Sequence, residues 1–310
     1  MRSVRRRGSG YDVLVIGGGI AGLTAAWAAA RRGFATALLE EAPLFGGQVA
    51  NVEALEGFPT VSETSGTALA SALVDACRAL GVVVVQEAAK GLAAGGASQQ
   101  VSSETQTLRA TNVVVASGGR LRALGVPGEE ELRGRGVSQC APCDGPLFRG
   151  EDVVVVGGGD AALQEALVLA GLCRSVTIVC RGALRARRHH VDRVTARPNV
   201  RFVWESTISA IIGAQGGVEA VRLRSVKDGA ESTLACAGIF PFIGSEPNTA
   251  FLPDEFERDE AGRLRTDPSF RTSLPGIWAV GAVRAGYSGE LAAAAGEGAA
   301  VIAGIAAIAS

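Results

Sequence analysis

The sequence has few of the features that mark nucleic-acid-binding, secreted or membrane-spanning proteins. Its 310 residues carry a net charge of −1, so there is no basic excess to attract nucleic acid. No apolar run follows the basic residues at the start of the chain, as a secretory signal would require. The apolar stretch 291–310 contains Glu297 and three glycines, which favours a buried helix over a membrane span. We therefore expect a cytoplasmic protein that binds neither nucleic acid nor membrane.

Cysteine is also sparse, with six residues in the whole chain. Only Cys140 and Cys143 lie close together, which excludes the dense disulfide framework of small secreted domains. A Cys-x-x-Cys pair is either a redox couple or half of a metal site, and the spacing alone leaves both readings open. The other four cysteines lie in apolar or helical stretches and are expected in the core.

What the chain does have is an internal repeat. The segments 11–41 and 151–181 each begin with a run of β-branched residues, pass through glycines and continue as an Ala/Leu-rich stretch. Each then ends in a second apolar run. A strand buried on both faces of a parallel sheet has this composition, so each segment predicts a β-strand, a helix and a second β-strand. The fold class expected is α/β, with two Rossmann-like dinucleotide-binding domains.

The glycine spacing in both segments fits a dinucleotide-binding turn. The first segment reads GGGIAG (17–22) and the second GGGDAA (157–162). In this fingerprint Gly17 and Gly157 form the tight turn, and Gly19 and Gly159 let the backbone approach a pyrophosphate. The third position must be small so that the helix can pack on the strand. A phosphate would then bind at the helix N-terminus.

The two segments differ in charge after their second strand. The first has Glu40 and Glu41, and a carboxylate there accepts hydrogen bonds from a ribose hydroxyl. The second has Arg181, followed by Arg185, and a guanidinium suits a 2′-phosphate that a carboxylate would repel. The second site is therefore predicted to prefer NADP(H) over NAD(H).

With these motifs, the chain resembles the bacterial low-molecular-weight thioredoxin reductases, which are flavoproteins. The resemblance runs from about residue 11 to about residue 308. It is carried by GGGIAG, FGGQVANV (45–52), GRGVSQCAPCDG (134–145), FIGSEPNT (242–249), GIWAVGAV (276–283) and AAGEGAA (294–300). It implies a discontinuous FAD-binding domain, 11–118 and 246–310, with an NADP(H)-binding domain, 119–245, inserted into it. Hinges are expected at Gly118-Gly119 and Gly244-Ser245, and a homodimer is expected from the family.

The resemblance also implies the site residues. The FAD contacts would be Gly17, Gly19, Ile20, Ala21, Gly22, Glu40, Glu41, Gly47, Gln48, Gly281, Ala282, Glu290 and Leu291. The NADP(H) contacts would be Gly157, Gly159, Asp160, Ala161, Arg181 and Arg185.

The catalytic residues implied are Cys140, Cys143 and Asp144. Cys140 and Cys143 would form a redox-active disulfide, with Cys143 nearer the flavin and Cys140 attacking the substrate. Asp144 would act as the acid/base. No metal is expected, because a zinc site needs four ligands and no second Cys or His pair has suitable spacing.

Five departures from the family pattern keep the substrate open. Cys180-Arg181-Gly182 retains only one of two arginines that the family has after the second strand of the NADP(H)-binding domain. Ala282 replaces an aspartate that contacts the flavin ribityl chain, and Gly289-Glu290 replaces an Arg-Gln pair. Gly57-Phe58-Pro59 replaces an Asn-aromatic-Pro, and Pro146-Leu147 replaces two aromatics that help dock thioredoxin.

We expect an FAD-dependent dithiol–disulfide oxidoreductase that passes electrons between NADP(H), FAD and the cysteine pair, with a thioredoxin-like protein as substrate. One alternative is an oxidase that closes a dithiol in a small natural product, with oxygen or NADP⁺ as acceptor. Another is a redox sensor that binds FAD without productive use of NADPH.

Overall fold

The computed structural model describes residues 10–52, 55 and 64–309, and it divides into two compact units. Unit 1 comprises Met1–Arg120 and Glu246–Ser310, and unit 2 comprises Leu121–Ser245. Gly57-Phe58-Pro59 lies outside the described residues. The α/β class predicted from the two repeats is confirmed, since each repeat forms the start of a parallel sheet.

Unit 1 is built on a seven-stranded sheet in the order β3-β2-β1-β6-β5-β4, with β16 also paired to β6. Its strands are β1 (Tyr11–Ile16), β2 (Thr36–Leu39), β3 (Val83–Val85), β4 (Gly91–Ala93), β5 (Gln99–Ser102), β6 (Thr107–Val115) and β16 (Ile277–Ala279). Strands β3, β2, β1, β6 and β16 are parallel, and β4 and β5 are antiparallel. Its helices are α1 (Ile20–Arg31), η1 (Gly47–Asn51), α2 (Gly66–Ala79), η3 (Gly281–Val283) and α6 (Leu291–Ala309).

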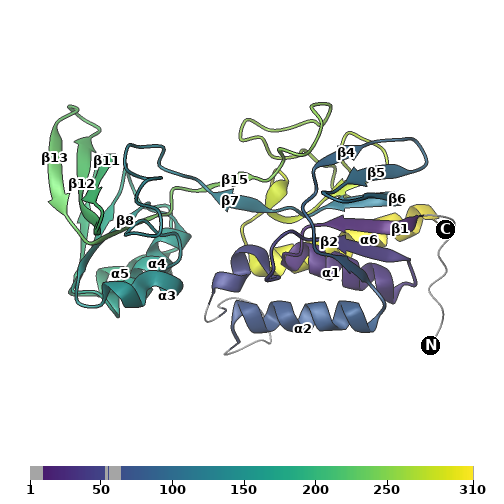
Figure 1. Ribbon diagram of the computed structural model, residues 1–310, viewed down its shortest axis with the longest axis horizontal. Coiled ribbons are helices and arrows are strands. Elements are labelled where there is room, and N and C mark those ends of the chain that lie inside the picture. The colour runs from purple at the N-terminus through teal and green to yellow at the C-terminus, as the bar shows by residue number, and fades with distance from the viewer. Residues whose placement is uncertain (1–9, 53–54, 56–63, 310) are drawn as a thin grey trace. The chain divides into compact units, whose positions relative to one another are not determined.

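Alternate residues of each strand in unit 1 form two cores. Val13 and Val15 of β1 face the helices α1, α2 and α6, and Figure 1 shows α1 and α2 on the same side of the sheet. Leu14 and Ile16 point to the opposite face, where they pack with β4, β5 and residues of the segment 252–283. A strand buried on both faces must be apolar at every position, and this explains the continuous apolar runs in the sequence.

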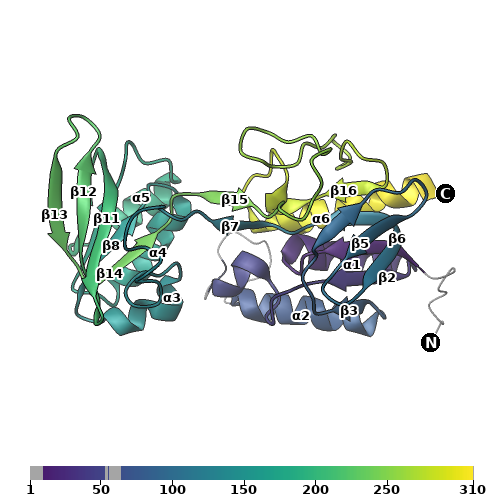
Figure 2. The same cartoon turned by 45° about the horizontal axis from the view of Figure 1, so that its top comes forward.

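Unit 2 has a four-stranded parallel sheet in the order β10-β9-β8-β14. Its strands are β8 (Asp152–Val156), β9 (Ser175–Val179), β10 (Val200–Val203) and β14 (Gly238–Pro241), and its helices are α3 (Ala141–Asp144), η2 (Gly145–Phe148), α4 (Asp160–Ala170) and α5 (Arg188–Thr195). A separate antiparallel sheet, β11 (Ser206–Ala214), β12 (Gly217–Ser225) and β13 (Glu231–Ala235), covers the other face. Figure 2 shows this arrangement, with the helices on one side of β8 and β11–β13 on the other.

The chain passes between the units twice, and the two passages pair as a small sheet of β7 (Gly119–Leu121) and β15 (Ser245–Pro247). Gly118 and Gly244 lie beside this sheet with φ of 66° and 108°, a conformation that favours glycine. A Cβ added to either glycine would meet no atom within 4 Å. Gly118 and Gly244 therefore lie uncrowded at the passages, whereas a Cβ on Gly119 would lie 2.7 Å from the Glu246 carbonyl oxygen.

The C-terminal stretch forms α6, a 19-residue helix. Residues 291–308 of it are long and apolar enough to cross a membrane, a test that the core helix of a soluble protein also passes. Ala294, Val301, Ile302 and Ile305 pack in the unit 1 core. Ala292, Gly296, Ala299 and Ala303 are exposed, so the expectation of a buried helix holds for one face only.

Candidate dinucleotide and disulfide sites

The first glycine turn follows β1 and leads directly into α1. Gly17 has φ of 106°, and its N–H donates to the Leu39 carbonyl of β2 at 2.8 Å. A Cβ on Gly22 would lie 1.9 Å from the Gly17 oxygen, so the helix can approach the strand only with glycine here. Gly19, by contrast, has one atom within 4 Å of its hypothetical Cβ, at 4.0 Å, which leaves room for a ligand against the backbone. The turn fits a dinucleotide pyrophosphate.

Predicted FAD residues from a second segment lie beside this turn. The Gly46 N–H donates to the Gly18 carbonyl at 2.8 Å, and a Cβ on Gly47 would lie 3.4 Å from the Gly19 Cα. Gln48 follows, and its side-chain amide donates to the Gly119 carbonyl at 2.6 Å. The structure therefore brings Gly47 next to Gly19 and connects Gln48 to β7.

Glu40 lies where the sequence predicted a ribose-binding carboxylate. One of its carboxylate oxygens accepts from the Gly18 N–H, and the other accepts from the Ala42 N–H at 2.8 Å. Both bonds hold the carboxylate over the glycine turn at the carboxyl end of β2. Glu41 is exposed beside it. A carboxylate in this position suits a ribose hydroxyl and disfavours a phosphate.

The C-terminal FAD residues lie at the turn η3 and at the start of α6. Gly281 has φ of 74°, and a Cβ on it would lie 3.0 Å from the Ala21 Cβ. This contact places the turn against the first residues of α1. Glu290 precedes α6, and its carbonyl accepts from the Tyr287 hydroxyl at 2.8 Å and from the Ala294 N–H at 3.0 Å. Leu291 begins the helix, and Ala282 is half-buried in η3.

The second glycine turn repeats the first in unit 2. Gly157 has φ of 137°, and its N–H donates to the Val179 carbonyl of β9 at 3.0 Å. Ala162 takes the place of Gly22 and is fully buried. A Cβ on Gly159 would meet no atom within 4 Å, so this turn also leaves its backbone open to a phosphate. The neighbouring Ala161 is exposed.

Arginines surround the second turn. The backbone N–H groups of Arg185 and Ala186 donate to the Gly158 carbonyl at 2.7 and 3.2 Å, so the loop after β9 folds back over the glycines. The guanidinium groups of Arg181 and Arg185 are exposed, and neither has an acidic partner among the described residues. The Arg185 backbone lies beside the glycine turn, and guanidinium groups without acidic partners carry the charge that would suit a 2′-phosphate.

Asp160 begins α4 and bonds to Arg187. Its carboxylate accepts from the Arg187 backbone N–H at 2.7 Å and from the Arg187 Nε at 2.8 Å. Burial opposes ionisation of Asp160, but the hydrogen bonds from Arg187 outweigh it and lower the pKa of the carboxyl. The pair ties the arginine loop to the start of α4.

Cys140 and Cys143 form a disulfide, with S–S 2.05 Å and Cα–Cα 5.3 Å. Cys140 is the N-cap of α3, and the Cys143 N–H points at its sulfur at 3.2 Å. This donor would stabilise a thiolate on Cys140 after reduction. Cys143 is exposed and Cys140 is half-buried. Asp144 ends α3, where its N–H donates to the Cys140 carbonyl at 3.1 Å.

The other four cysteines are buried free thiols, as predicted. Burial raises the pKa of Cys77, Cys173 and Cys180 to about 11 and that of Cys236 to about 12. They stay protonated near neutral pH and are poor nucleophiles. Within the described residues, no group of three or more His, Cys, Asp or Glu side chains is placed to hold a metal ion.

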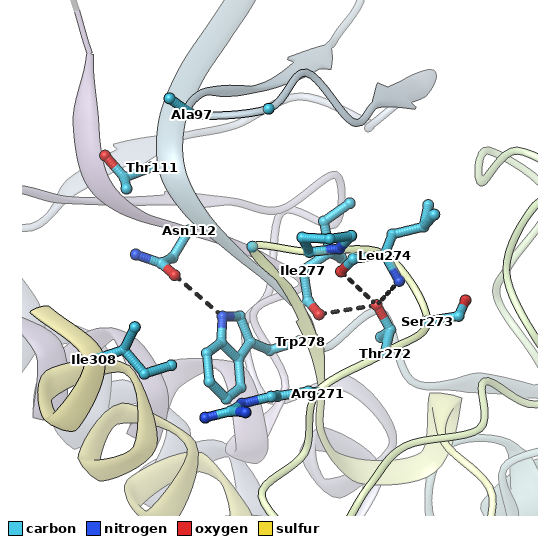
Figure 3. Close-up of a pocket in the computed structure, with 13 residues that line it drawn as sticks. Ala97, Thr111, Asn112, Arg271, Thr272, Ser273, Leu274, Ile277, Trp278 and Ile308 are labelled. Carbon is cyan, nitrogen blue, oxygen red and sulfur yellow. Dashed lines mark hydrogen bonds between the residues drawn. The ribbon is translucent and has the colours of Figure 1, made fainter.

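A cavity of about 480 Å³ lies at the opposite end of the unit 1 sheet, by the amino end of β16. Figure 3 shows the Trp278 indole bonded to Asn112, with Arg271 beside the ring. The Thr272 hydroxyl is bonded to the backbone at Leu274 and Ile277. These polar groups are used within the fold. The glycine turns, at the carboxyl ends of the strands, are the better candidate sites.

A protein-family model named pyridine nucleotide-disulphide oxidoreductase matches residues 11–299. The chain belongs to this family. Its relatives include a thioredoxin reductase from Treponema pallidum, 39% identical over 291 residues, which cover 93% of this chain and 94% of that protein. The family assignment confirms the resemblance that the motifs predicted.

Solved structures agree with this relationship. The Lactococcus lactis thioredoxin reductase superposes with a TM-score of 0.92 at 36% identity, covering 96% of this chain and 98% of that one. The T. acidophilum thioredoxin reductase superposes with a TM-score of 0.91 at 29% identity, covering 97% and 99%. The predicted pair of dinucleotide-binding domains is thereby confirmed as a fold.

As a pyridine nucleotide-disulphide oxidoreductase, the protein is an FAD-dependent, NADP(H)-linked enzyme that acts on disulfides. The glycine turns with open backbone and the closed Cys140–Cys143 disulfide fit these cofactors and this chemistry.

The structure adds side-chain contacts that the motifs did not indicate. Glu165 of α4 accepts from the Ala141 N–H at 2.7 Å, between the two cysteines. Burial raises the pKa of Glu165. Glu297 of α6 binds the turn at Gly281. A lone glutamate among alanines and glycines was the available signal for Glu297, whereas nothing local marked Glu165.

Proposed function

We propose that this oxidoreductase uses NADPH bound in unit 2 and FAD held in unit 1 to reduce the Cys140–Cys143 disulfide, which then reduces a thioredoxin-like protein. The supporting observation is the closed disulfide, which precedes in sequence a second glycine turn that the loop carrying the exposed Arg185 folds over. The two cofactors would supply a hydride donor and a redox ring that connects it to the thiols.

FAD would be held by Gly17, Gly19, Ile20, Ala21, Gly22, Glu40, Glu41, Gly47, Gln48, Gly281, Ala282, Glu290 and Leu291. Support comes from the contacts of Gly46–Gly47 and Gly281 with the Gly17–Gly22 turn. NADP(H) would be held by Gly157, Gly159, Asp160, Ala161, Arg181 and Arg185. Support comes from the folding of the arginine loop over Gly158.

The thiol chemistry follows from the geometry of α3. After reduction, the Cys140 thiolate, stabilised by the Cys143 N–H, attacks one sulfur of the substrate disulfide. A mixed disulfide forms, and the released substrate thiolate would take a proton from Asp144, the residue directly after Cys143. The Cys143 thiolate then attacks Cys140 Sγ, which releases the second substrate thiol and restores the Cys140–Cys143 disulfide. Two electrons leave the pair in each cycle.

A protein substrate is favoured by the relatives. The Treponema, Lactococcus and T. acidophilum proteins are each named thioredoxin reductase.

The test is NADPH-dependent reduction of thioredoxin by the FAD-loaded protein. We expect Cys140→Ser and Cys143→Ser to abolish thioredoxin reduction, because either change removes the disulfide. Cys173→Ala, at a buried thiol outside the pair, is the control and should retain activity. Turnover by either serine variant at the wild-type rate would reject the role of the pair.

A second candidate is a small-molecule dithiol oxidase, favoured by the changes at Ala282, Glu290 and Pro146-Leu147. It predicts oxygen uptake on a small dithiol and no reduction of thioredoxin. A redox sensor predicts that NADPH fails to bleach the flavin absorbance. We also propose a cytoplasmic homodimer, and the molar mass in solution tests the dimer.

A further inference from the structure

Glu297 and Arg284 form a nearly buried ion pair in unit 1. The Arg284 Nη2 lies 2.5 Å from Glu297 Oε1, and the Arg284 Nε lies 2.9 Å from Oε2. The Arg284 side chain is 16% exposed and the Glu297 side chain is 11% exposed. A carboxylate so far from water is costly unless it is paired and hydrogen-bonded, and here both oxygens are used. Glu297 is also the one charged residue in α6, so it does not belong to a solvated charged face.

The same carboxylate holds a backbone turn. Glu297 Oε2 accepts from the Gly281 N–H at 2.7 Å, at the first residue of η3. Gly281 contacts Ala21, as described above. Gly298, which follows Glu297 in α6, also contacts Ala21, since a Cβ on Gly298 would lie 2.3 Å from the Ala21 carbonyl oxygen. Ala21 is the second residue of α1, directly after the glycine turn. Glu297 therefore fixes η3 against the first turn of α1.

Arg284 holds the other end of the same turn. Its N–H donates to the Gly281 carbonyl at 3.1 Å, and its Nη1 donates to the Ala285 carbonyl at 2.8 Å. The guanidinium lies 5.1 Å from the centre of the Phe270 ring. The ion pair thus connects Gly281, the first residue of η3, with Arg284 and Ala285, the two residues that follow η3.

Ala282 lies inside this turn, at the position where the resemblance places a flavin-binding aspartate. The chain lacks that anion, but the Glu297 carboxylate of α6 accepts a hydrogen bond from the N–H of the preceding residue, Gly281. We propose that Glu297, neutralised by Arg284, is the positioning residue of the FAD site and offsets the missing aspartate by fixing η3 against Ala21. This inference rests on the proposed location of FAD in unit 1.

The test compares FAD affinities of the deflavinated full-length protein. Glu297→Gln keeps the shape and an acceptor for Gly281 but leaves Arg284 without its charge partner. We expect the Kd for FAD, measured by quenching of flavin fluorescence, to rise about tenfold or more. Ala282→Asp added to Glu297→Gln should restore most of the affinity, because it returns an anion to the turn.

The control is Glu104→Gln, which breaks the exposed Lys90–Glu104 pair and should leave the Kd for FAD unchanged. Binding of 2′,5′-ADP, expected in unit 2, should be equal in all variants and reports that the chain is folded. If Glu297→Gln does not fold, the apolar pair Arg284→Met with Glu297→Met replaces it and should also bind FAD weakly.

A Kd for FAD within twofold of the wild-type value in Glu297→Gln, or in the double methionine variant, overturns the positioning role. Parallel loss of 2′,5′-ADP binding also overturns it, because the pair is then a general stabiliser. If the wild-type protein itself binds no FAD, the proposed function fails instead.

Discussion

The two glycine turns have the same backbone and opposite chemical surroundings. In each, the first glycine has positive φ and donates to the last residue of the neighbouring strand, Leu39 in one and Val179 in the other. The Glu40 carboxylate lies over the first turn, whereas Arg181 and Arg185 follow the second strand of unit 2 and the Arg185 backbone bonds to the second turn. On the proposed assignment, the backbone can serve either dinucleotide, and the residues after the second strand select which one binds.

The turns also differ in how tightly helix and strand approach. A Cβ at Gly22 would lie 1.9 Å from the Gly17 oxygen. The corresponding residue in unit 2 already has a Cβ, since it is Ala162, and it is buried without a clash. The α1 turn is thus the closer-packed copy.

The largest effect is expected from Gly22→Ala. The added methyl group cannot be accommodated beside Gly17, so α1 must move away from β1 at a cost of about 3 kcal/mol. We expect the purified protein to lose nearly all bound flavin, measured as the ratio of absorbance at the flavin band to that of the protein. Full flavin content would show that both turns tolerate a Cβ at the third position of the motif.

Arg181→Ala tests the charge difference. Loss of a charge-assisted contact to the 2′-phosphate should raise the KM for NADPH about tenfold, and NADH, which lacks that phosphate, should be little affected. Steady-state kinetics with both cofactors measure the change. Equal effects on both cofactors would contradict a phosphate-binding role for Arg181.

Glu165→Gln probes the support of the disulfide in unit 2. Because burial raises the pKa of Glu165, the folded state favours the protonated form. That stability is present at low pH and is lost as the pH rises through the raised pKa. Glutamine does not titrate, so the variant should gain a few degrees in Tm relative to wild type as the pH rises above the ordinary glutamate pKa of about 4.3. A pH-independent difference would exclude titration of Glu165 as the cause.

The smallest effect is expected from Ala162→Gly. The change removes a buried methyl group and loosens α4, with a cost of about 1 kcal/mol. Its Tm should fall slightly while NADPH affinity is retained. A loss as severe as that of Gly22→Ala would show that the two third positions are equally critical.

The glycine turns were predictable because each depends on a short local motif, and the disulfide was implied by the family resemblance, since the Cys-x-x-Cys spacing alone left a metal site open. Gly17 and Gly157 need little beyond their neighbours in sequence to take their roles. The charges of Glu40 and Arg181 were also readable, because they follow a strand whose length is fixed by the fold.

Contacts between distant segments were not predictable in the same way. Glu165 meets Ala141 across 24 positions, and Glu297 meets Gly281 across 16. No periodic pattern encodes such contacts, since they depend on how α4 and α6 pack. The exposed face of α6 was likewise not predictable, because alanine and glycine occur on both faces of the helix.

The burial of four thiols has a consequence for damage by peroxides. Oxidants attack thiolates, and these four sulfurs offer almost none near neutral pH. Irreversible overoxidation should therefore fall on Cys140 and Cys143 alone, and only while their bond is open. Without NADPH, Cys140 and Cys143 would stay joined as a disulfide, and an oxidant would find no thiolate in the pair to attack.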